Sequence, residues 1–446
     1  MQKTNCDLAE KSLEIALRNG CNNARITYNV NNQSSYSVRN DKLDRLHQAN
    51  GSSLYLQLFV DGKYGSYSTN RTEEDDLNLF IAKAVEATRL ISPDPFRGLP
   101  DINLCYKGQF PDLGQFDKTI ETITPTEKSR IAYECAAEIY KTDKRIVSVN
   151  CEYGDSDEFM FIVDSNGFKG SSRQSLFTLS AECSVKGSGD SRPEGWWYES
   201  SLFLNKFNIK GVGTKAFERA VSRLNPKKLK SGIYNMVLEN TVSSRMIAPL
   251  ISALNGAAIQ QNNSFLKDKL GKKVFSERFQ LNDTPHLFGA AGSRLFDGEG
   301  IATKNMNLIE NGVVNYYFIN TYYSNKMGVP VTVEGPSVPS CKYSDINQGN
   351  IQDKTLKDIL RNCDKGILVT GFNGGNSNTS TGDFSFGVQG FYFENGEVLH
   401  PVKEMNVTGN LINLWNNFID AGSDPRETSR WLIPTLAFES VNFNGL

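Results

Sequence analysis

The chain has 446 residues, about three times the length of an ordinary domain, which excludes a single small module. Its charge is nearly balanced, with 48 basic and 50 acidic side chains and a net charge of −2, which excludes nucleic-acid binding through bulk positive charge. Only three histidines are present, His47, His286 and His400, and this scarcity argues against a histidine-rich metal site in this chain.

The beginning of the chain predicts an amphipathic helix over residues 1–20, with Gly20 as its C-cap, rather than a signal peptide. No stretch of the sequence approaches the ~20 consecutive apolar residues that a membrane-spanning helix needs. The eight cysteines are scattered and form no C-x-x-C pair, which is typical of reduced thiols. We therefore expect a cytoplasmic protein that does not contact a membrane.

Residues 1–105 predict a first α+β unit. Apolar and polar side chains alternate at 26–30, 36–38 and 54–60, and Asp61-Gly62 is a typical two-residue hairpin turn into a strand at 64–68. An apolar stripe from Leu77 to Thr88 predicts an amphipathic helix after these strands, and the proline-rich segment 92–100 ends it.

The same order of elements recurs over residues 106–226. Thr124, Pro125 and Glu127 form the sequence pattern of a helix capping box with proline at the first helical position. Strands are predicted at 147–153, 159–163, 177–185 and 196–203, and a helix at 217–224 closes the unit. The recurrence indicates a structural duplication or a chance similarity of layout, because residue identity between the two units is slight.

Residues 227–446 predict a strand-rich C-terminal domain. Helices are expected at 243–259, 356–363 and 409–421, strands at 232–238 and 367–370, and hairpin turns at Asn311-Gly312 and Asn395-Gly396. The segment 371–387, rich in Gly, Asn and Ser, is predicted to be a loop. The expected fold class is therefore α+β, with two related units of helices on an antiparallel sheet followed by this domain.

The residues themselves give no evident catalytic centre. The three histidines are far apart in the sequence, so no H-E-x-x-H pair can bring two imidazoles to one metal ion from one helix face. The stretch Asp383-Phe384-Ser385-Phe386-Gly387 lacks the first glycine of a G-x-S-x-G nucleophile elbow. We therefore assign no catalytic and no metal-binding residue.

Two features of the sequence are weak candidates for a binding site. Asp297 and Glu299, which follow Phe296, suit acid–base chemistry, or they are solvated carboxylates in a glycine-rich turn. The adjacent Trp196 and Trp197 face opposite sides of a predicted strand. One of the two indoles is expected in the core, and the other can then bind a peptide or a protein partner.

Three stretches of the C-terminal region resemble the TldD/PmbA family, whose members were once called modulators of DNA gyrase. They are GAAIQQNNSFLKDKLGKK at 256–273, the sequence at 286–328 that begins HLFGAAGSRLFDGEG, and TGDFSFGVQGFYFENGEVLHPVKEMNVTGNL at 381–411. The first 226 residues resemble the family in their layout more than in their motifs.

The resemblance implies one of two branches. TldD-like members carry an H-E-x-x-x-H helix and are metallopeptidases with zinc as the expected ion, whereas PmbA-like (TldE) members lack that helix and pair with a TldD-like subunit. In this chain the corresponding helix runs near residues 245–256, where Ile247, Ala248 and Ser252 stand at the positions of the ligands and the acid. None of these side chains binds zinc as histidine does. The resemblance therefore implies a non-catalytic, PmbA-like subunit without a cofactor of its own.

The family's activity implies unfolded peptides as substrates, which the assembly degrades or matures. This chain would complete the peptide-binding chamber around the zinc of its partner. Seven residues are the candidates for contacts with peptide or partner: Trp196, Trp197, Phe296, Asp297, Glu299, Asp383 and Ser385. The isolated chain is expected to be able to form a homodimer through the surface that the partner would cover.

Two alternatives to this function stay open. The first is an autonomous hydrolase that uses Ser385, a cysteine or a metal held by scattered residues. The second is a scaffold that acts on DNA gyrase, as the older family name suggests. Neither the charge nor any motif predicts direct contact with nucleic acid.

Overall fold

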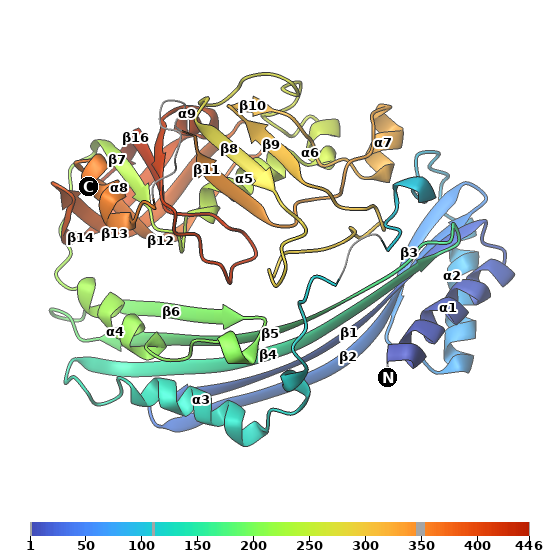
Figure 1. Cartoon of the computed structure of the whole chain (residues 1–446), viewed down its shortest axis with the longest axis horizontal. Helices are drawn as coiled ribbons and strands as arrows, with labels where there is room; N and C mark the ends of the chain where they lie inside the picture. Colours follow the sequence, from blue (N-terminus) through green and yellow to red (C-terminus); the bar gives the residue numbers. More distant parts are fainter. Residues whose placement is uncertain (1, 109–111, 345–352, 446) are drawn as a thin grey trace.

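The computed structural model of the chain describes residues 2–108, 112–344 and 353–445. The first half of the chain forms a long curved sheet, and the second half forms a strand-rich domain that lies over the concave face of this sheet (Figure 1). The predicted α+β fold class is confirmed. The predicted domain boundaries at 105/106 and 226/227 stay a prediction.

The N-terminal half contains one antiparallel sheet with the strand order β3-β2-β1-β4-β5-β6. The strands are β1 (Asn23–Arg39), β2 (Lys42–Val60), β3 (Lys63–Thr69), β4 (Ile146–Asp164), β5 (Lys169–Val185) and β6 (Glu194–Ser201). β1 and β4 pair at the centre, with Arg25 opposite Asp164. Each of the two predicted units therefore contributes three strands to a shared sheet.

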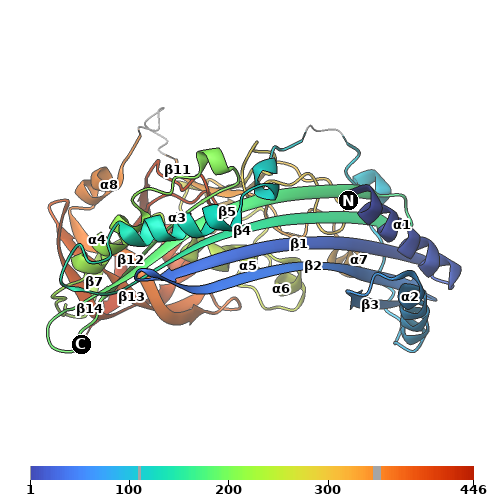
Figure 2. The same cartoon turned by 90° about the horizontal axis from the view of Figure 1, so that it is seen from below.

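Helices cover the convex face of this sheet in two pairs (Figure 2). α1 (Gln2–Arg18) and α2 (Glu74–Arg89) lie at one end, and α3 (Pro125–Ala137) and α4 (Val212–Ser222) lie at the other. The predicted capping box begins α3: the Thr124 hydroxyl accepts a hydrogen bond from the Glu127 amide, and the Glu127 carboxylate accepts one from the Thr124 amide.

Two separate hydrophobic cores lie between the sheet and these helices. One contains Ile26 and Phe161 beneath α1 and α2, and the other contains Cys151 and Leu179 beneath α3 and α4. Between the cores the strands continue through polar stretches that pair with one another, as Asn31 to Ser35 does with Glu158 to Gly154. The sequence prediction broke the strands at these stretches, and it was wrong there because alternation of apolar side chains stops between the cores.

Between the two hydrophobic cores, a buried polar network joins β1, β4 and α3. Asp155 of β4 accepts hydrogen bonds from the Ser34 hydroxyl at 2.7 Å and the Tyr153 hydroxyl at 2.9 Å. The Lys128 ammonium of α3 lies 2.7 Å from the same carboxylate. A buried charge is tolerated only when it is paired and hydrogen-bonded, and this network meets both conditions.

The C-terminal domain contains two sheets and short helices. In one sheet, of order β14-β13-β12-β7-β16-β15, β14 also pairs with β16, which closes a barrel-like ring; the other sheet has the order β10-β9-β8-β11. The strands are β7 (Gly232–Leu238), β8 (Phe279–Asp283), β9 (Met306–Glu310), β10 (Val313–Val314), β11 (Pro339–Tyr343), β12 (Lys365–Ser377), β13 (Asp383–Glu394), β14 (Glu397–Asn410), β15 (Phe418–Ala421) and β16 (Leu436–Asn444). The helices are α5 (Ser244–Ala253), α6 (Gly256–Gln260), α7 (Thr321–Met327), α8 (Leu356–Asn362) and α9 (Leu411–Asn416).

The segment 371–387 is mostly strand, so its prediction as a loop was wrong. It contains the end of β12, a turn at 378–382 and the start of β13. Its glycines allow an irregular strand: the register shifts between Asn373 and Asn376, and Gly375 between them has φ +82°. A Cβ on Gly375 would lie 2.1 Å from the Ser385 carbonyl oxygen. Composition alone therefore suggested a loop where glycine in fact permits close strand pairing.

Two predicted helices of this domain are shorter than expected. The helix predicted at 243–259 is divided into α5 and α6, because Asn255 leaves the helical conformation and its side chain accepts a hydrogen bond from the Ala257 amide. The helix predicted at 409–421 is α9 alone, and the chain continues as strand β15. Among the described residues, no helix is long and apolar enough to cross a membrane.

Candidate functional site

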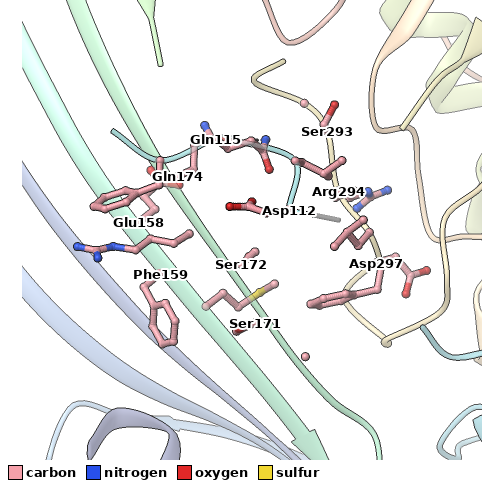
Figure 3. A pocket seen from close by; sticks show the side chains of 18 of the residues that line it. Asp112, Gln115, Glu158, Phe159, Ser171, Ser172, Gln174, Ser293, Arg294 and Asp297 are labelled. Carbon is pink, nitrogen blue, oxygen red and sulfur yellow. Dashed lines mark hydrogen bonds between the residues drawn. The ribbon is translucent and has the colours of Figure 1, made fainter. Parts of the chain in front are cut away.

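A cleft of 1610 Å³ lies between the concave face of the N-terminal sheet and the C-terminal domain (Figure 3). β4, β5 and β6 form its floor, and residues 291–298 and 428–430 of the C-terminal domain form the opposite wall. The segment that carries Asp112 and Gln115 adds a third side. Because Cys6 and Ile102 also line it, residues from all three predicted regions of the chain meet in one cleft.

The floor of the cleft follows from the two-residue period of β5. Side chains of one parity, such as Phe177 and Leu179, are buried under the helices, and those of the other parity, such as Ser172, Gln174 and Thr178, line the cleft. These side chains of β5 are short or neutral and offer hydrogen-bonding groups, and the charged residues Glu158 of β4 and Lys169 and Arg173 of β5 complete the floor.

Gln115 spans the cleft from the sheet to the C-terminal domain. Its side-chain amide donates hydrogen bonds to the Gln174 side chain at 3.3 Å and to the Ala290 carbonyl oxygen at 2.9 Å. Phe296 makes a second junction, because its ring packs at 5.3 Å from that of Phe168 and at 5.9 Å from that of Tyr106. The N-terminal sheet and the C-terminal domain are therefore connected by two sets of contacts along the cleft.

Asp297 lines the cleft but its carboxylate holds the loop together. The oxygens accept hydrogen bonds from the amides of Glu299, Ile301 and Glu334, at 2.9 to 3.0 Å. Burial raises the pKa of Asp297 to about 7, and the nearby Glu334 carboxylate adds to this rise. The group is therefore poised to change its charge near neutral pH.

The free energy of unfolding is expected to depend on pH through Asp297. Since the pKa of Asp297 is raised in the folded state, the carboxyl ionises first in the unfolded chain, and stability falls as pH rises from about 4 to about 7. Relative to an Asp297→Asn variant, the wild-type chain should lose on the order of 2 kcal/mol between about pH 5 and about pH 8 in urea titrations. A difference between the two proteins that stays constant over this range would contradict the expectation.

Glu299 lies outside the lining of the cleft. Its carboxylate accepts hydrogen bonds from the amide of Thr321, at 2.8 Å, and from the hydroxyl of the same residue, at 2.7 Å, at the start of α7. The structure thus separates the two carboxylates, which the sequence suggested as a pair: Asp297 supports the cleft wall and Glu299 supports a helix start.

The two tryptophans of β6 face opposite sides of the sheet, as predicted. Trp197 lies against α4, where the ammonium of Lys215 is 4.3 Å from its ring centroid. Trp196 is 51% exposed, and its ring centroid lies 4.9 Å from that of Tyr198, which lines the cleft. Of the two indoles, Trp196 is therefore the one that is accessible to a peptide or a protein partner.

Asp383 and Ser385 lie on β13 and do not line the cleft. The Asp383 carboxylate accepts hydrogen bonds from the Asn410 side chain at 2.9 Å and the Thr381 hydroxyl at 2.7 Å, which closes the turn before the strand. Ser385 is exposed, and no base among the described residues contacts its hydroxyl. The structure thus brings Phe296 and Asp297 to the cleft and leaves these two residues apart from it.

The histidines lie on three separate parts of the fold. His47 is on β2, His286 is in a loop where its ring contacts the Thr303 hydroxyl, and His400 is on β14 against Tyr392. Burial lowers the pKa of His286. In the described part of the chain, no group of three or more His, Cys, Asp or Glu side chains is arranged to hold a metal ion.

Sequence reasoning missed several lining residues, above all Arg294 and Arg430 in the wall and Gln115 and Gln174 at the junction. Arg294 directly precedes the Leu-Phe-Asp-Gly-Glu-Gly stretch that contains the candidate residues Phe296, Asp297 and Glu299. Arg430 lies in a polar segment without a recognisable motif. Only the fold brings these side chains together, so no local pattern marks them.

Comparisons with known proteins agree along the whole chain. Family models for PmbA/TldA metallopeptidases match residues 24–88 as domain 1, 118–224 as the central domain and 231–445 as the C-terminal domain. The metalloprotease PmbA homolog of Haemophilus influenzae is 26% identical over 437 residues, which cover 97% of this chain and 94% of that protein. The zinc metalloprotease TldD homolog of Saccharolobus solfataricus is 24% identical over 373 residues, 81% of this chain and 80% of that protein.

Solved structures share the fold. A crystal structure from Bacteroides thetaiotaomicron, named for a modulator of DNA gyrase, superposes with a TM-score of 0.94 at 46% identity, covering 99% of this chain and 98% of that one. TldE from Thermococcus kodakarensis has a TM-score of 0.84 at 18% identity, over 98% of this chain and 100% of that one. The resemblance inferred from the sequence motifs is confirmed, and this chain belongs to the PmbA/TldD family of peptidases.

Proposed function

We propose that this chain is the PmbA-like (TldE-type) subunit of a two-subunit metallopeptidase that degrades or matures unstructured peptides. In this proposal a TldD-like partner carries the zinc ion, and this chain completes the peptide-binding chamber. The relatives named as metalloproteases, and the TldE neighbour in structure, support the assignment to such a system.

The observation that carries the proposal is the environment of α5, where the TldD branch would hold its metal. Ile247 is fully buried in the C-terminal core, and Ser252 is exposed with its hydroxyl donating to the Ala248 carbonyl oxygen at 3.1 Å. An aliphatic side chain and a methyl group cannot ligate zinc, and the serine is engaged by its own helix. The residues present do not fit the metal that the family name implies, so we assign the hydrolytic step to the partner chain.

The role left to this chain is to bind and orient the peptide. The floor of the cleft presents neutral hydrogen-bonding side chains along β5, with the charged Glu158 beside them, and such a surface suits an extended chain recognised mainly through its backbone rather than through a fixed sequence. We further propose that the protein works in the cytoplasm and that the isolated chain forms a homodimer through the surface that its partner covers.

The test compares the chain alone with a mixture that contains a family member bearing H-E-x-x-x-H. We expect the purified chain to hold no stoichiometric zinc and to leave an unstructured test peptide intact. It should co-elute with the TldD-like subunit in size-exclusion chromatography, and the mixture should cleave the peptide. Replacing a histidine of the partner's motif is expected to abolish cleavage without loss of the complex.

Two outcomes would point to the alternatives. Stoichiometric zinc together with peptide cleavage by the chain alone would contradict the proposal and support an autonomous hydrolase. Capture of gyrase subunits instead of a TldD-like protein would support the scaffold reading. Both outcomes are read from the same purified chain.

A further inference from the structure

The wall of the cleft carries a guanidinium group that makes no ion pair within contact distance and no hydrogen bond among the described residues. Arg430 lines the cleft beside Arg294, and within the described residues no acidic group pairs with Arg430 and no acceptor takes a hydrogen bond from its side chain. Arg294, by contrast, is engaged: its Nε donates to the Ser337 hydroxyl at 2.9 Å, and its Nη1 lies 3.6 Å from the Glu334 carboxylate.

The two guanidinium groups repel one another. Burial and the neighbouring charge of Arg294 lower the pKa of Arg430, and Asp283 is the acidic group that counters this effect. The Asp283 carboxylate is already used, because it accepts hydrogen bonds from the amides of Ser337 and Val338 at 2.7 to 3.0 Å. Since a guanidinium stays protonated in proteins, Arg430 keeps its positive charge, and the Glu334 carboxylate of this wall pairs with Arg294.

The position of Arg430 is built into the fold. A Cβ on Gly292 would lie 2.9 Å from Arg430 Cγ, 2.9 Å from the Arg430 carbonyl oxygen and 2.4 Å from the Ser337 carbonyl oxygen. The stem of the arginine therefore occupies space that any other residue at 292 would fill. Such close packing fixes the stem of Arg430 at the cleft, while the residue as a whole remains exposed.

The surface opposite the arginine suits an extended peptide. Ser172, Gln174 and Thr178 of β5 present neutral hydrogen-bonding groups, and Tyr198, packed against Trp196, provides an aromatic flank. A planar guanidinium binds a carboxylate through two parallel hydrogen bonds, and this pairing is strongest where water is partly excluded.

We propose that Arg430, with Arg294 beside it, binds a carboxylate of a peptide that lies extended along the β5 floor of the cleft. The proposal rests on the proposed function, since it takes the substrate to be a peptide, and it adds a charge requirement that the family assignment does not contain. The carboxylate is either the C-terminal group of the peptide or the side chain of an Asp or Glu.

Three forms of one fluorescein-labelled peptide of Gly, Ser, Ala and Tyr distinguish these sources. They are the free acid, the C-terminal amide, and the amide with one internal Asp. With the full-length chain, fluorescence anisotropy should show the free acid, the amide with the internal Asp, or both binding at least about tenfold more tightly than the plain amide. Tight binding of the internal-Asp amide alone assigns a side-chain carboxylate, tight binding of the free acid alone assigns the C-terminal group, and tight binding of both shows that the site accepts either.

Variants then assign the effect to Arg430. Arg430→Gln is expected to weaken binding of the acidic peptide by about tenfold and to leave the plain amide unchanged, and Arg430→Lys should recover part of the loss through its charge alone. Arg130→Gln on the outer face of α3 removes one positive charge far from the cleft and should change nothing. An unchanged melting temperature of the Arg430 variant confirms that it is folded.

Equal binding of all three peptides by the wild-type chain would overturn the proposal, and so would equal binding of the preferred acidic peptide by wild type and Arg430→Gln. So would a variant that keeps its peptide affinity but no longer co-elutes with the TldD-like subunit, because the arginine would then serve the interface. The proposed function is tested separately, by complex formation and peptide cleavage in the mixture with the TldD-like subunit. If the proposed function is wrong, that mixture is inactive even with the wild-type chain.

Discussion

Asp164→Asn is expected to lower the free energy of unfolding by about 3–5 kcal/mol, because it leaves a buried guanidinium without its counter-charge. Asp164 and Arg25 face each other across β4 and β1, with 3.6 Å between their charged groups and side-chain exposures of 1% and 3%. The substitution keeps the acceptor oxygen that holds the amides of Asn166 and Phe168, so it changes mainly the charge.

The geometry of the pair explains why replacing only one of the two residues should lower the free energy of unfolding so strongly. Arg25 Nε and Nη2 and Asp164 Oδ2 have no hydrogen-bond partner among the described residues, so the ionic attraction is the main compensation for burying both charges. Burial raises the pKa of Asp164, while Arg25 lowers it. In Arg25→Met the carboxyl can take up a proton, and the loss in stability should therefore shrink at acidic pH.

A double-mutant cycle measured by urea denaturation isolates the interaction. The combination of Arg25→Met with Asp164→Asn should cost clearly less than the sum of the two single substitutions, because no unpaired charge remains. Arg45 and Glu152 form a matched control on the same sheet, at 3.5 Å but with 66% and 36% of their side chains exposed. Glu152→Gln should cost less than about 1 kcal/mol. An equally small cost for Asp164→Asn would contradict the argument.

The fold was predictable where a strand or helix has one apolar face. The stripe from Leu77 to Thr88 became α2, and the Asp61-Gly62 turn joins β2 to β3. The long strands were not predictable, since the residues between the two cores contact no apolar layer. There the register is set by neighbouring strands and by the Lys128–Asp155 network, and such contacts leave no periodic signal in the sequence.

The candidate site was predictable only in part, for a related reason. The motif around Asp297 pointed to the correct wall, but two of its conspicuous residues act locally, as the amides bound to Asp297 and the Thr321 contact of Glu299 show. Arg430 reaches the same wall from a different segment because Gly292 leaves room for it. A glycine chosen for the close approach of another segment looks, in the sequence, like any other glycine.

Trp415→Ala is expected to lower the free energy of unfolding of the C-terminal domain by about 3–5 kcal/mol, because it removes the largest fully buried side chain among the described residues and leaves a cavity. The indole joins the two sheets of this domain. It stacks on Phe279 of β8 at 3.9 Å and meets Phe418 of β15 and Phe438 of β16 edge-on at 5.2 and 5.1 Å. Loss of the ring therefore removes contacts to both sheets at once.

Trp415→Phe separates packing from polarity at the same position. The indole N–H of Trp415 has no hydrogen-bond partner among the described residues, and a buried unsatisfied donor opposes folding. Phenylalanine removes that donor and keeps an aromatic ring against Phe279, so it should cost much less than alanine. Trp196→Ala, at a side chain that is 51% exposed, is the surface control and should cost less than about 1 kcal/mol. If Trp415→Ala shifted the urea midpoint no more than Trp196→Ala does, the two sheets would have to be held together elsewhere.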